Sequence, residues 1–315
     1  MKKKYRVAFI GAGYMAEEHI RAYKSIDEFD CVGIYSRNRN RALNLSNKYF
    51  LPSVFDSISS LYENTKADIV LICVNELSTY KVTLEAIKYS WVCLIEKPVG
   101  INFDEQYSIL KQAIIFNAKA YIALNRRHYS STRQVINALQ DSSDQRIVTV
   151  LDQENPSSAL ETGTPEVVCN NWMYANSVHL IDYFNIFCRG SLLNIENIVK
   201  LKKDSDFFML SKLIFSSGDI GVYNAVWDSP GPWSVTINTK NVRWEMRPLE
   251  TVSYLELNTR KSVSLSIDQN DIDFKPGLIF QALESLKLLN GEENCLPTLL
   301  EGFKASEIIK KIYDI

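Results

Sequence analysis

The chain has 315 residues, of which 46% are hydrophobic and 23% are charged, and its formal net charge at pH 7 is −2. This composition is typical of a globular protein, and the length allows two domains that each bury a core. The balanced charge excludes a bulk positive field for nucleic acid or an anionic membrane, and no basic-aromatic module is present.

The sequence shows no signature of a membrane span or a metal site. No apolar run approaches the roughly 18 residues that a membrane helix needs. The six cysteines are scattered, without CxxC or His/Cys metal spacing. Three of them, at positions 31, 73 and 93, fall in predicted strands, where a thiol behaves as a small core residue. We therefore expect a reduced, cytoplasmic protein without a metal ion.

The first predicted elements are a strand, a glycine turn and a helix in direct succession. Residues 5–10 read YRVAFI and run into GAGYMA, after which the apolar spacing is helical. Gly11 would allow the tight turn, Gly13 would leave room for a pyrophosphate, and Ala16 would let helix and strand pack closely. The diphosphate would bind the N–H groups at the helix start. The alternative is a glycine turn without a ligand. The residues predicted to contact a nucleotide cofactor here are Gly11, Ala12, Gly13, Tyr14 and Met15.

Strands and helices then alternate as far as residue 124. Further strands are predicted at 31–36, 67–74, 91–95 and 120–124, and helices at 39–50, 77–89 and 103–116. The run ADIVLICV at 67–74 is almost continuously apolar, as expected for a parallel strand covered on both faces. The alternation predicts a doubly wound parallel sheet, a Rossmann domain that spans residues 1–124.

The pattern changes after residue 125. A helix is predicted at 130–139, a strand at 146–153, a polar loop at 154–171 and a helix at 174–188. Runs of period two between 195 and 267, separated by Gly, Pro and Asn turns, predict an antiparallel sheet. Closing helices are expected at 276–289 and 297–315. These elements define a second α/β domain, 125–315, whose last helix could pack back toward the first domain.

The end of the second strand bears on the choice of cofactor. NAD-specific enzymes usually carry an acidic residue here, which binds the ribose hydroxyls. This chain has Ser36 and Arg37 instead, which could bind a 2′-phosphate. The alternative is that Arg37 is a solvated loop charge. We favour NADP over NAD, and we expect Val74 and Asn75, at the end of the next long strand, to contact the same cofactor.

Two further segments carry candidate catalytic groups. Glu96-Lys97-Pro98-Val99 stands at the carboxyl end of a buried strand, where ligands of α/β sheets bind and where the pKa of a lysine can be lowered for catalysis. His179 and Asp182 are three residues apart on a predicted helix, so the carboxylate could orient the imidazole. The alternatives are a surface lysine that ends a strand and a histidine that faces the core.

Together these motifs resemble the Gfo/Idh/MocA oxidoreductases: GAGYMA, then EKPV, then Asn125-Arg126-Arg127, then a helical His-x-x-Asp. The resemblance implies a Rossmann domain followed by a domain with a large, open, mostly antiparallel sheet. It also implies NAD(P)-dependent hydride transfer on a sugar or sugar-derived alcohol. Lys97 would lie beside the reacting hydroxyl, and His179 would act as acid or base. The cofactor would contact Glu96, Lys97 and Asn125, and the substrate would contact Lys97, Arg126, Trp172, Asn176 and His179.

One position departs from the pattern of this family. Many members carry an aspartate four residues before the histidine, whereas this chain has Ala175, followed by Asn176. Alanine cannot transfer a proton, and an asparagine has no usable pKa. Three readings remain open: Lys97 and His179 suffice, the substrate brings its own acidic group, or catalysis has been lost. The Asn-Ser-x-His-x-x-Asp version with Trp172 upstream resembles the branch associated with surface-polysaccharide and nucleotide-sugar metabolism.

The favoured hypothesis is an NAD(P)-dependent dehydrogenase or reductase of a sugar or nucleotide sugar. The alternatives are a cofactor-binding regulator with reduced catalysis and a reductase of a non-sugar substrate such as a linear tetrapyrrole. We also expect a homodimer or homotetramer that forms through the sheet of the second domain. Its aromatic residues either form that interface or pack against their own helices: Tyr223, Trp227, Trp233, Trp244 and Tyr254.

Overall fold

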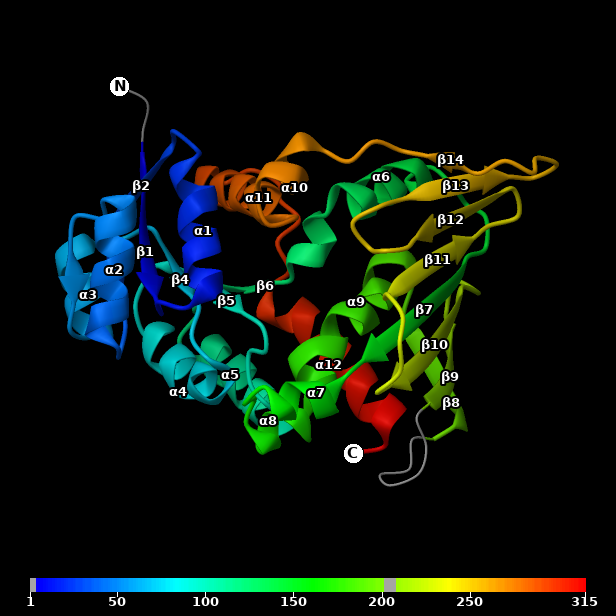
Figure 1. Cartoon of the computed structure of the whole chain (residues 1–315), viewed down its shortest axis with the longest axis horizontal. Coiled ribbons are helices and arrows are strands. Elements are labelled where there is room, and N and C mark those ends of the chain that lie inside the picture. Colours follow the sequence, from blue (N-terminus) through cyan, green and yellow to red (C-terminus); the bar gives the residue numbers. More distant parts are fainter. Residues whose placement is uncertain (1–3, 201–207) are drawn as a thin grey trace. The chain divides into compact units, whose positions relative to one another are not determined.

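A computed structural model describes residues 4–200 and 208–315 of the chain (Figure 1). The contacts divide these residues into two units. The first unit comprises the described residues up to Asn125 together with Ile272–Phe303, and the second comprises those of Arg126–Asp271 together with Lys304–Ile315. The division expected from the sequence, 1–124 and 125–315, differs from this one chiefly in residues 272–303.

The first unit is built on a parallel sheet of six strands in the order β3-β2-β1-β4-β5-β6, which confirms the predicted Rossmann arrangement. The strands are β1 (Tyr5–Ile10), β2 (Phe29–Tyr35), β3 (Val54–Phe55), β4 (Ile69–Ile72), β5 (Val92–Glu96) and β6 (Ala120–Ala123). The helices are α1 (Tyr14–Lys24), α2 (Arg39–Tyr49), α3 (Ile58–Thr65), α4 (Glu76–Ala86), α5 (Phe103–Ile115) and α11 (Leu278–Asn290). β3 and α3 were not predicted, because a two-residue strand and a helix of eight residues carry little periodic signal.

The sheet of the first unit is buried on both faces. Successive residues of β1 alternate between two apolar clusters: Ala8 and Ile10 belong to one, whereas Val7 and Phe9 belong to the other. All four residues of β4 are buried, which explains the unbroken apolar run at this strand. A parallel sheet with helices on both sides requires this pattern.

The turn after β1 depends on a glycine. Gly11 has a φ of +111°, and its backbone N–H donates to the carbonyl oxygen of Tyr35 at 2.8 Å. A Cβ at this position would lie 2.0 Å from the carbonyl oxygen of Cys73, the residue that follows β4. The positive φ and the close backbone approach both require glycine, so β1 and β4 can end side by side only with this residue.

We expect the Gly11→Ala substitution to lower the free energy of unfolding by about 3 kcal/mol or more, because backbone strain and an overlap with a fixed carbonyl combine. Gly163→Ala is the matched control. Gly163 also has a positive φ, +97°, but a Cβ there would meet nothing within 4 Å. Urea denaturation of the two variants separates the effect of the overlap from that of backbone strain. Equal losses of the free energy of unfolding would show that the close approach to Cys73 contributes nothing.

The second unit contains a sheet of eight strands among its described residues, in the order β14-β13-β12-β11-β7-β10-β9-β8. Every pair of neighbours is antiparallel except β7 and β10, which confirms the expected mostly antiparallel sheet. The strands are β7 (Ile147–Glu154), β8 (Leu192–Val199), β9 (Phe208–Phe215), β10 (Ile220–Trp227), β11 (Ser234–Asn238), β12 (Val242–Met246), β13 (Ser253–Glu256) and β14 (Val263–Ser264). Residues 201–207, within the predicted run of strands, lie outside the described residues.

Helices occupy one face of this sheet (Figure 1). They include α6 (Ser130–Leu139) and α9 (Val178–Phe187), and a single π-helical turn, Met173–Ser177, leads into α9. The approach of α9 is close, because a Cβ at Gly221 of β10 would lie 2.9 Å from the Phe184 ring. The remaining helical segments are the 3-10 turn Asn125–His128, α7 (Pro156–Glu161), α8 (Glu166–Cys169), α10 (Gln269–Asp273) and α12 (Leu299–Tyr313), the last two of which cross the division between the units.

The loop expected at 154–171 contains two short helices, so this prediction was wrong. The Asn155 side chain caps α7 by accepting from the Ser158 N–H at 2.8 Å, and Pro156 occupies the first turn. Pro165 precedes α8. A proline in the first helical turn loses no hydrogen bond, so these residues begin helices here instead of interrupting them.

Candidate cofactor site and buried acid–base cluster

The glycine turn leaves the start of α1 open. Gly13 precedes the helix in an extended conformation, and a Cβ there would meet nothing within 4 Å. Within the described residues, no side chain caps the first N–H groups of α1. Ala16 is fully buried against the sheet. The geometry therefore offers open space, exposed backbone donors and the positive end of a helix dipole, which suit a diphosphate.

Two side chains of the turn take different positions. The side chain of Tyr14 is 64% exposed, and the Lys275 ammonium lies 5.3 Å from its ring centroid. Met15 packs against a buried cluster that includes Leu278 and Ile279. Met15 can therefore offer its backbone to a cofactor, whereas Tyr14 can also offer its ring. Ala12 is half-buried between these residues and the core.

The candidate ribose-binding residues lie at the next strand end. Ile10 and Tyr35 are register partners of β1 and β2, so Ser36 is close to the glycine turn. The Ser36 hydroxyl accepts from the Asn38 N–H at 3.3 Å, and Arg37 is exposed. No acidic side chain stands at positions 36–38. Beyond β4, Val74 is half-buried and Asn75 caps α4 by accepting from the Ser78 N–H at 3.0 Å.

The carboxyl end of β5 holds a buried carboxylate beside the candidate lysine. Glu96 is 6% exposed, and its Oε1 lies 2.7 Å from Nε2 of His19 on α1. Its Oε2 accepts from the backbone N–H of Lys97 at 3.2 Å. The Nδ1 atom of His19 has no hydrogen-bond partner among the described residues. We therefore assign the Nε2–H tautomer, which donates to Glu96 and leaves only an acceptor unpaired.

His19 was not among the predicted site residues. Its position on the first helix gave no sign of its partner, because Glu96 is 77 residues away in the sequence. The structure shows that it braces Glu96 and, through the backbone, the start of the Lys97 segment. Asn125, another candidate cofactor residue, is buried, and its Nδ2 donates to the carbonyl oxygen of Pro276 at 3.1 Å.

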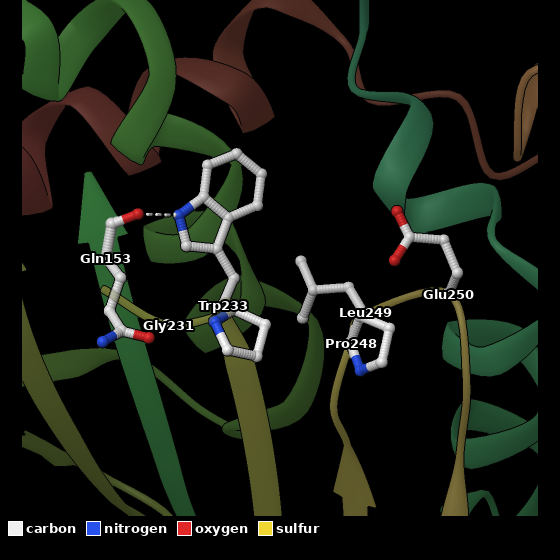
Figure 2. Close-up of a pocket in the computed structure, with 7 residues that line it drawn as sticks. Gln153, Gly231, Trp233, Pro248, Leu249 and Glu250 are labelled. Atoms are coloured by element: carbon white, nitrogen blue, oxygen red, sulfur yellow. Dashed lines mark hydrogen bonds between the residues drawn. The ribbon is translucent and has the colours of Figure 1, made fainter. Parts of the chain in front are cut away.

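In the second unit, Arg126 stacks on an indole ring. Its guanidinium carbon lies 4.4 Å from the Trp233 ring centroid, and the Trp233 Nε1–H donates to the carbonyl oxygen of Gln153 at 2.7 Å (Figure 2). Trp233 also lines a cavity of about 250 Å³. The residues around this cavity are Gln153, Gly231, Pro232, Trp233, Pro248, Leu249 and Glu250 (Figure 2).

The expected pairing of His179 with Asp182 was wrong. Asp182 is buried, and its two oxygens accept from Nε and Nη2 of Arg127, each at 2.6 Å. Asn185 donates to the same carboxylate at 3.3 Å. A bidentate guanidinium is the stronger partner for a buried carboxylate, so Asp182 anchors α9 to the segment that contains Arg127.

Two carboxyl groups that the sequence analysis missed lie at the end of β7. Asp152 and Glu154 are 0% and 3% exposed, on the strand face that α9 covers. Glu154 Oε2 accepts from Trp172 Nε1 at 2.7 Å and from Asn176 Nδ2 at 2.9 Å. Asp152 Oδ2 accepts from the Tyr223 hydroxyl at 2.5 Å. The available signal was the period of two in this strand, which places Asp152 and Glu154 on the same buried face as Val148 and Val150.

This cluster alters the chemistry of its acids. Burial and the negative charge of Asp152 raise the pKa of Glu154 to about 8, against the hydrogen bonds from Trp172 and Asn176, which lower it. Burial likewise raises the pKa of Asp152. Asn176 links the cluster to the segment that carries His179, which is 3% exposed and follows Asn176 by three residues. The predicted residues Trp172, Asn176 and His179 therefore share one region of the second unit with two acids.

The described residues show no group of three or more His, Cys, Asp or Glu side chains that could hold a metal ion. Across the same residues, no helix combines the length and the apolar character of a membrane span. A glycine turn that leads into an uncapped helix, at the carboxyl edge of a parallel sheet, defines the class of dinucleotide-binding Rossmann proteins.

Comparisons with known proteins agree with this class. Residues 5–115 match the Gfo/Idh/MocA sequence profile, described as an oxidoreductase family with an NAD-binding Rossmann fold. D-glucoside 3-dehydrogenase of Escherichia coli (strain K12) is 31% identical over 101 residues, which cover 32% of this chain and 29% of that relative. The predicted resemblance is thus confirmed over residues 5–115, where the chain matches the NAD-binding Rossmann part of the Gfo/Idh/MocA oxidoreductases.

Solved structures extend the likeness of fold to the whole chain. UDP-N-acetylglucosamine 3-dehydrogenase from Acidithiobacillus ferrooxidans aligns over 99% of this chain and 97% of its own, with a TM-score of 0.77 and 15% identity. A dehydrogenase from Chromobacterium violaceum aligns over 99% and 95%, with a TM-score of 0.82 and 14% identity. At these identities the likeness establishes the fold.

We expect Gly13→Val to weaken nucleotide binding by at least about tenfold, because the new side chain would fill the space in front of the helix start. The extended conformation of Gly13 and the open space around it should keep the free energy of unfolding within about 1 kcal/mol of wild type. Titration of NADPH and NADH fluorescence, with the melting temperature as control, tests this. An unchanged affinity would place the cofactor elsewhere.

Proposed function

We propose that the protein is an NAD(P)-dependent oxidoreductase that transfers hydride to or from a hydroxyl or ketone carbon of a sugar or nucleotide sugar, in surface-polysaccharide biosynthesis. The observation that carries this proposal lies within the first unit. The open glycine turn after β1 and the braced Glu96-Lys97 pair after β5 stand at the same carboxyl edge of one sheet. That edge is where α/β sheets bind their ligands.

Different residues would serve hydride transfer, proton transfer and positioning in the proposed reaction. A bound nicotinamide would accept or supply the hydride. When a hydroxyl is oxidised, its proton must also leave, and Lys97 or His179 would take it up. A cationic Lys97 would in addition stabilise negative charge on the substrate oxygen. His19 and Glu96 would hold the backbone of Lys97 in place, because they tie the end of β5 to α1.

We propose NADP as the preferred cofactor, with NAD as the alternative. The absence of an acid at positions 36–38 removes the usual acceptor for the ribose hydroxyls. Ser36 and the exposed Arg37 provide a hydroxyl and a cation at the corresponding strand end. The 2′-phosphate of NADP could bind both the Ser36 hydroxyl and the Arg37 guanidinium.

The names of two relatives favour a sugar as substrate, and the surroundings of Arg126 favour a nucleotide sugar. The relatives described above are named for dehydrogenation of a glucoside and of UDP-N-acetylglucosamine. Arg126 is half-buried, and among the described residues its guanidinium has the Trp233 ring, not a carboxylate, as its close partner. A stacked cation that forms no salt bridge among the described residues suits the phosphate groups of a nucleotide sugar.

We also propose that the chain acts as a homodimer or homotetramer through the sheet of the second unit. The aromatic residues expected at that interface divide into different environments. Tyr223 is fully buried and contacts Phe184 and Tyr313, and Trp244 is buried against Tyr254. The face opposite α9 instead presents half-buried apolar side chains from β7, β9 and β10, which a second copy could cover.

A cytoplasmic site of action is the remaining part of the proposal. The six cysteines all lie in the described part of the chain, where no disulfide joins them. This agrees with a reducing compartment. Small sugar and cofactor substrates would be available there.

Lys97→Met should lower the rate of hydride transfer at least about a hundredfold and change cofactor affinity by no more than a few-fold, because it removes the proton-exchanging group and keeps the apolar stem. The measurement is NAD(P)H absorbance over a panel of free sugars and nucleotide sugars. Lys88→Met, an exposed lysine beyond the end of α4, is the matched control. Wild-type turnover in the Lys97 variant would remove this residue from the mechanism, and cofactor binding without turnover of any substrate would favour a regulator.

Arg37→Asp should shift the ratio of NADP to NAD affinity toward NAD by about tenfold or more, because the cation is exchanged for an acceptor of ribose hydroxyls. Calorimetric titration with both nucleotides measures the ratio. Lys88→Asp makes the same change of charge away from the strand ends. If the ratio moves equally in both variants, Arg37 acts only through the net charge.

A further inference from the structure

The helix that carries His179 lacks a carboxyl group of its own next to the histidine. Position 175 is a buried alanine, and the Asp182 carboxylate is held by Arg127. The Glu154 carboxyl reaches the same part of the helix from strand β7. Trp172 and Asn176 both donate to it, and these residues flank Ala175 along the π-helical turn.

The protonation of the pair is indicated by the hydrogen bonds of Asp152. One carboxylate oxygen of Asp152 accepts from Tyr223. The other, Oδ1, is buried and has no hydrogen bond of good geometry among the described residues, although the nearby Ser177 hydroxyl lowers the pKa of Asp152 against the effect of burial. A buried carboxylate oxygen without a donor is costly. A proton on Glu154, two residues along the same strand face, would provide that donor. Two buried carboxyls so close together also repel each other when both are ionised.

We propose that Glu154 and Asp152 share one proton and that Glu154 supplies, from the strand, the ionisable carboxyl that the helix lacks at Ala175. This assignment rests on the proposed oxidoreductase function. In the oxidation direction, a bound nicotinamide would accept the hydride. The hydroxyl proton would pass to His179 and from its imidazolium to the ionised carboxyl pair, which thereby gains the shared proton. In the reduction direction, the pair returns the proton to His179, which protonates the ketone oxygen.

The charged and titratable groups around Glu154 come from several elements. Asp152 is its neighbour on β7, and the negative charge of Asp152 holds the proton on Glu154. Tyr223 from β10 donates to Asp152, and the Tyr313 hydroxyl from α12 lies 2.8 Å from that of Tyr223. The positive charge of Arg126 opposes the effect of burial on the pKa of Asp152.

The shared proton predicts a stability profile that does not depend on catalysis. The pKa of Glu154 is raised to about 8 in the folded protein, from a model-peptide value near 4.5, so the folded state binds the extra proton between these values. Stability from this group is fully present below pH 4.5 and is lost as the pH rises through about 8. The urea midpoint of wild type should therefore fall between pH 5 and pH 9 more steeply than that of Glu154→Gln.

The kinetic test uses the full-length protein with cofactor and the best sugar substrate of the panel. Wild-type kcat should show a pH limb with an apparent pKa near 8. Glu154→Gln should remove this limb and lower kcat by about tenfold to a hundredfold, with KM changed less than about threefold. Adding Ala175→Asp to this variant should restore at least part of the rate. Glu245→Gln, a partly exposed residue of β12, is the matched control.

Asp152→Asn tests the same pair if the glutamine variant does not fold. It removes the charge that raises the pKa of Glu154, so the kinetic limb and the loss of urea midpoint should both move to lower pH. A glutamine variant that keeps the wild-type rate and pH limb would overturn the proposal, as would an asparagine variant whose limb does not move. If wild type turns over no sugar, the proposed function fails, and the urea profile alone then decides whether the proton is shared.

Discussion

The close passage of the Gly11 backbone against the carbonyl group of Cys73 is the constraint on which the first unit depends. It lets β1 end beside β4 while the chain reverses into α1, so the helix start and the end of β2 meet at one edge of the sheet. Any side chain at this glycine would separate these elements. The site for a diphosphate is therefore a consequence of backbone packing, and the functional groups around it are added at neighbouring strand ends.

The two units use a similar device at those ends. Glu96 is the last residue of β5 and Glu154 is the last residue of β7, and both carboxyl groups are buried. Each is held by side chains of a helix: His19 in the first unit, and Trp172 with Asn176 in the second. The surroundings differ in charge, because only Glu154 has a second buried acid beside it. This difference assigns Glu96 to bracing and Glu154 to proton exchange.

Local patterns in the sequence were sufficient to predict the parallel sheet, the glycine turn and most helices of the first unit. Apolar runs and glycine positions determine the conformation of a few neighbouring residues, so they can be recognised from the sequence alone. The contact of His19 with Glu96 joins residues 77 positions apart, and that of Asn176 with Glu154 joins residues 22 positions apart. No local pattern encodes such pairs. The partner of Asp182 was also misjudged, because its helical spacing to His179 was visible and its contact with Arg127 was not.

Calorimetric titration of the full-length protein with NADP and with NAD is the measurement that tests the central claim most directly. The account predicts one binding site per chain for at least one of the two nucleotides, with a rise in melting temperature at saturation. The absence of both binding heat and thermal stabilisation at millimolar concentrations of either nucleotide would contradict it.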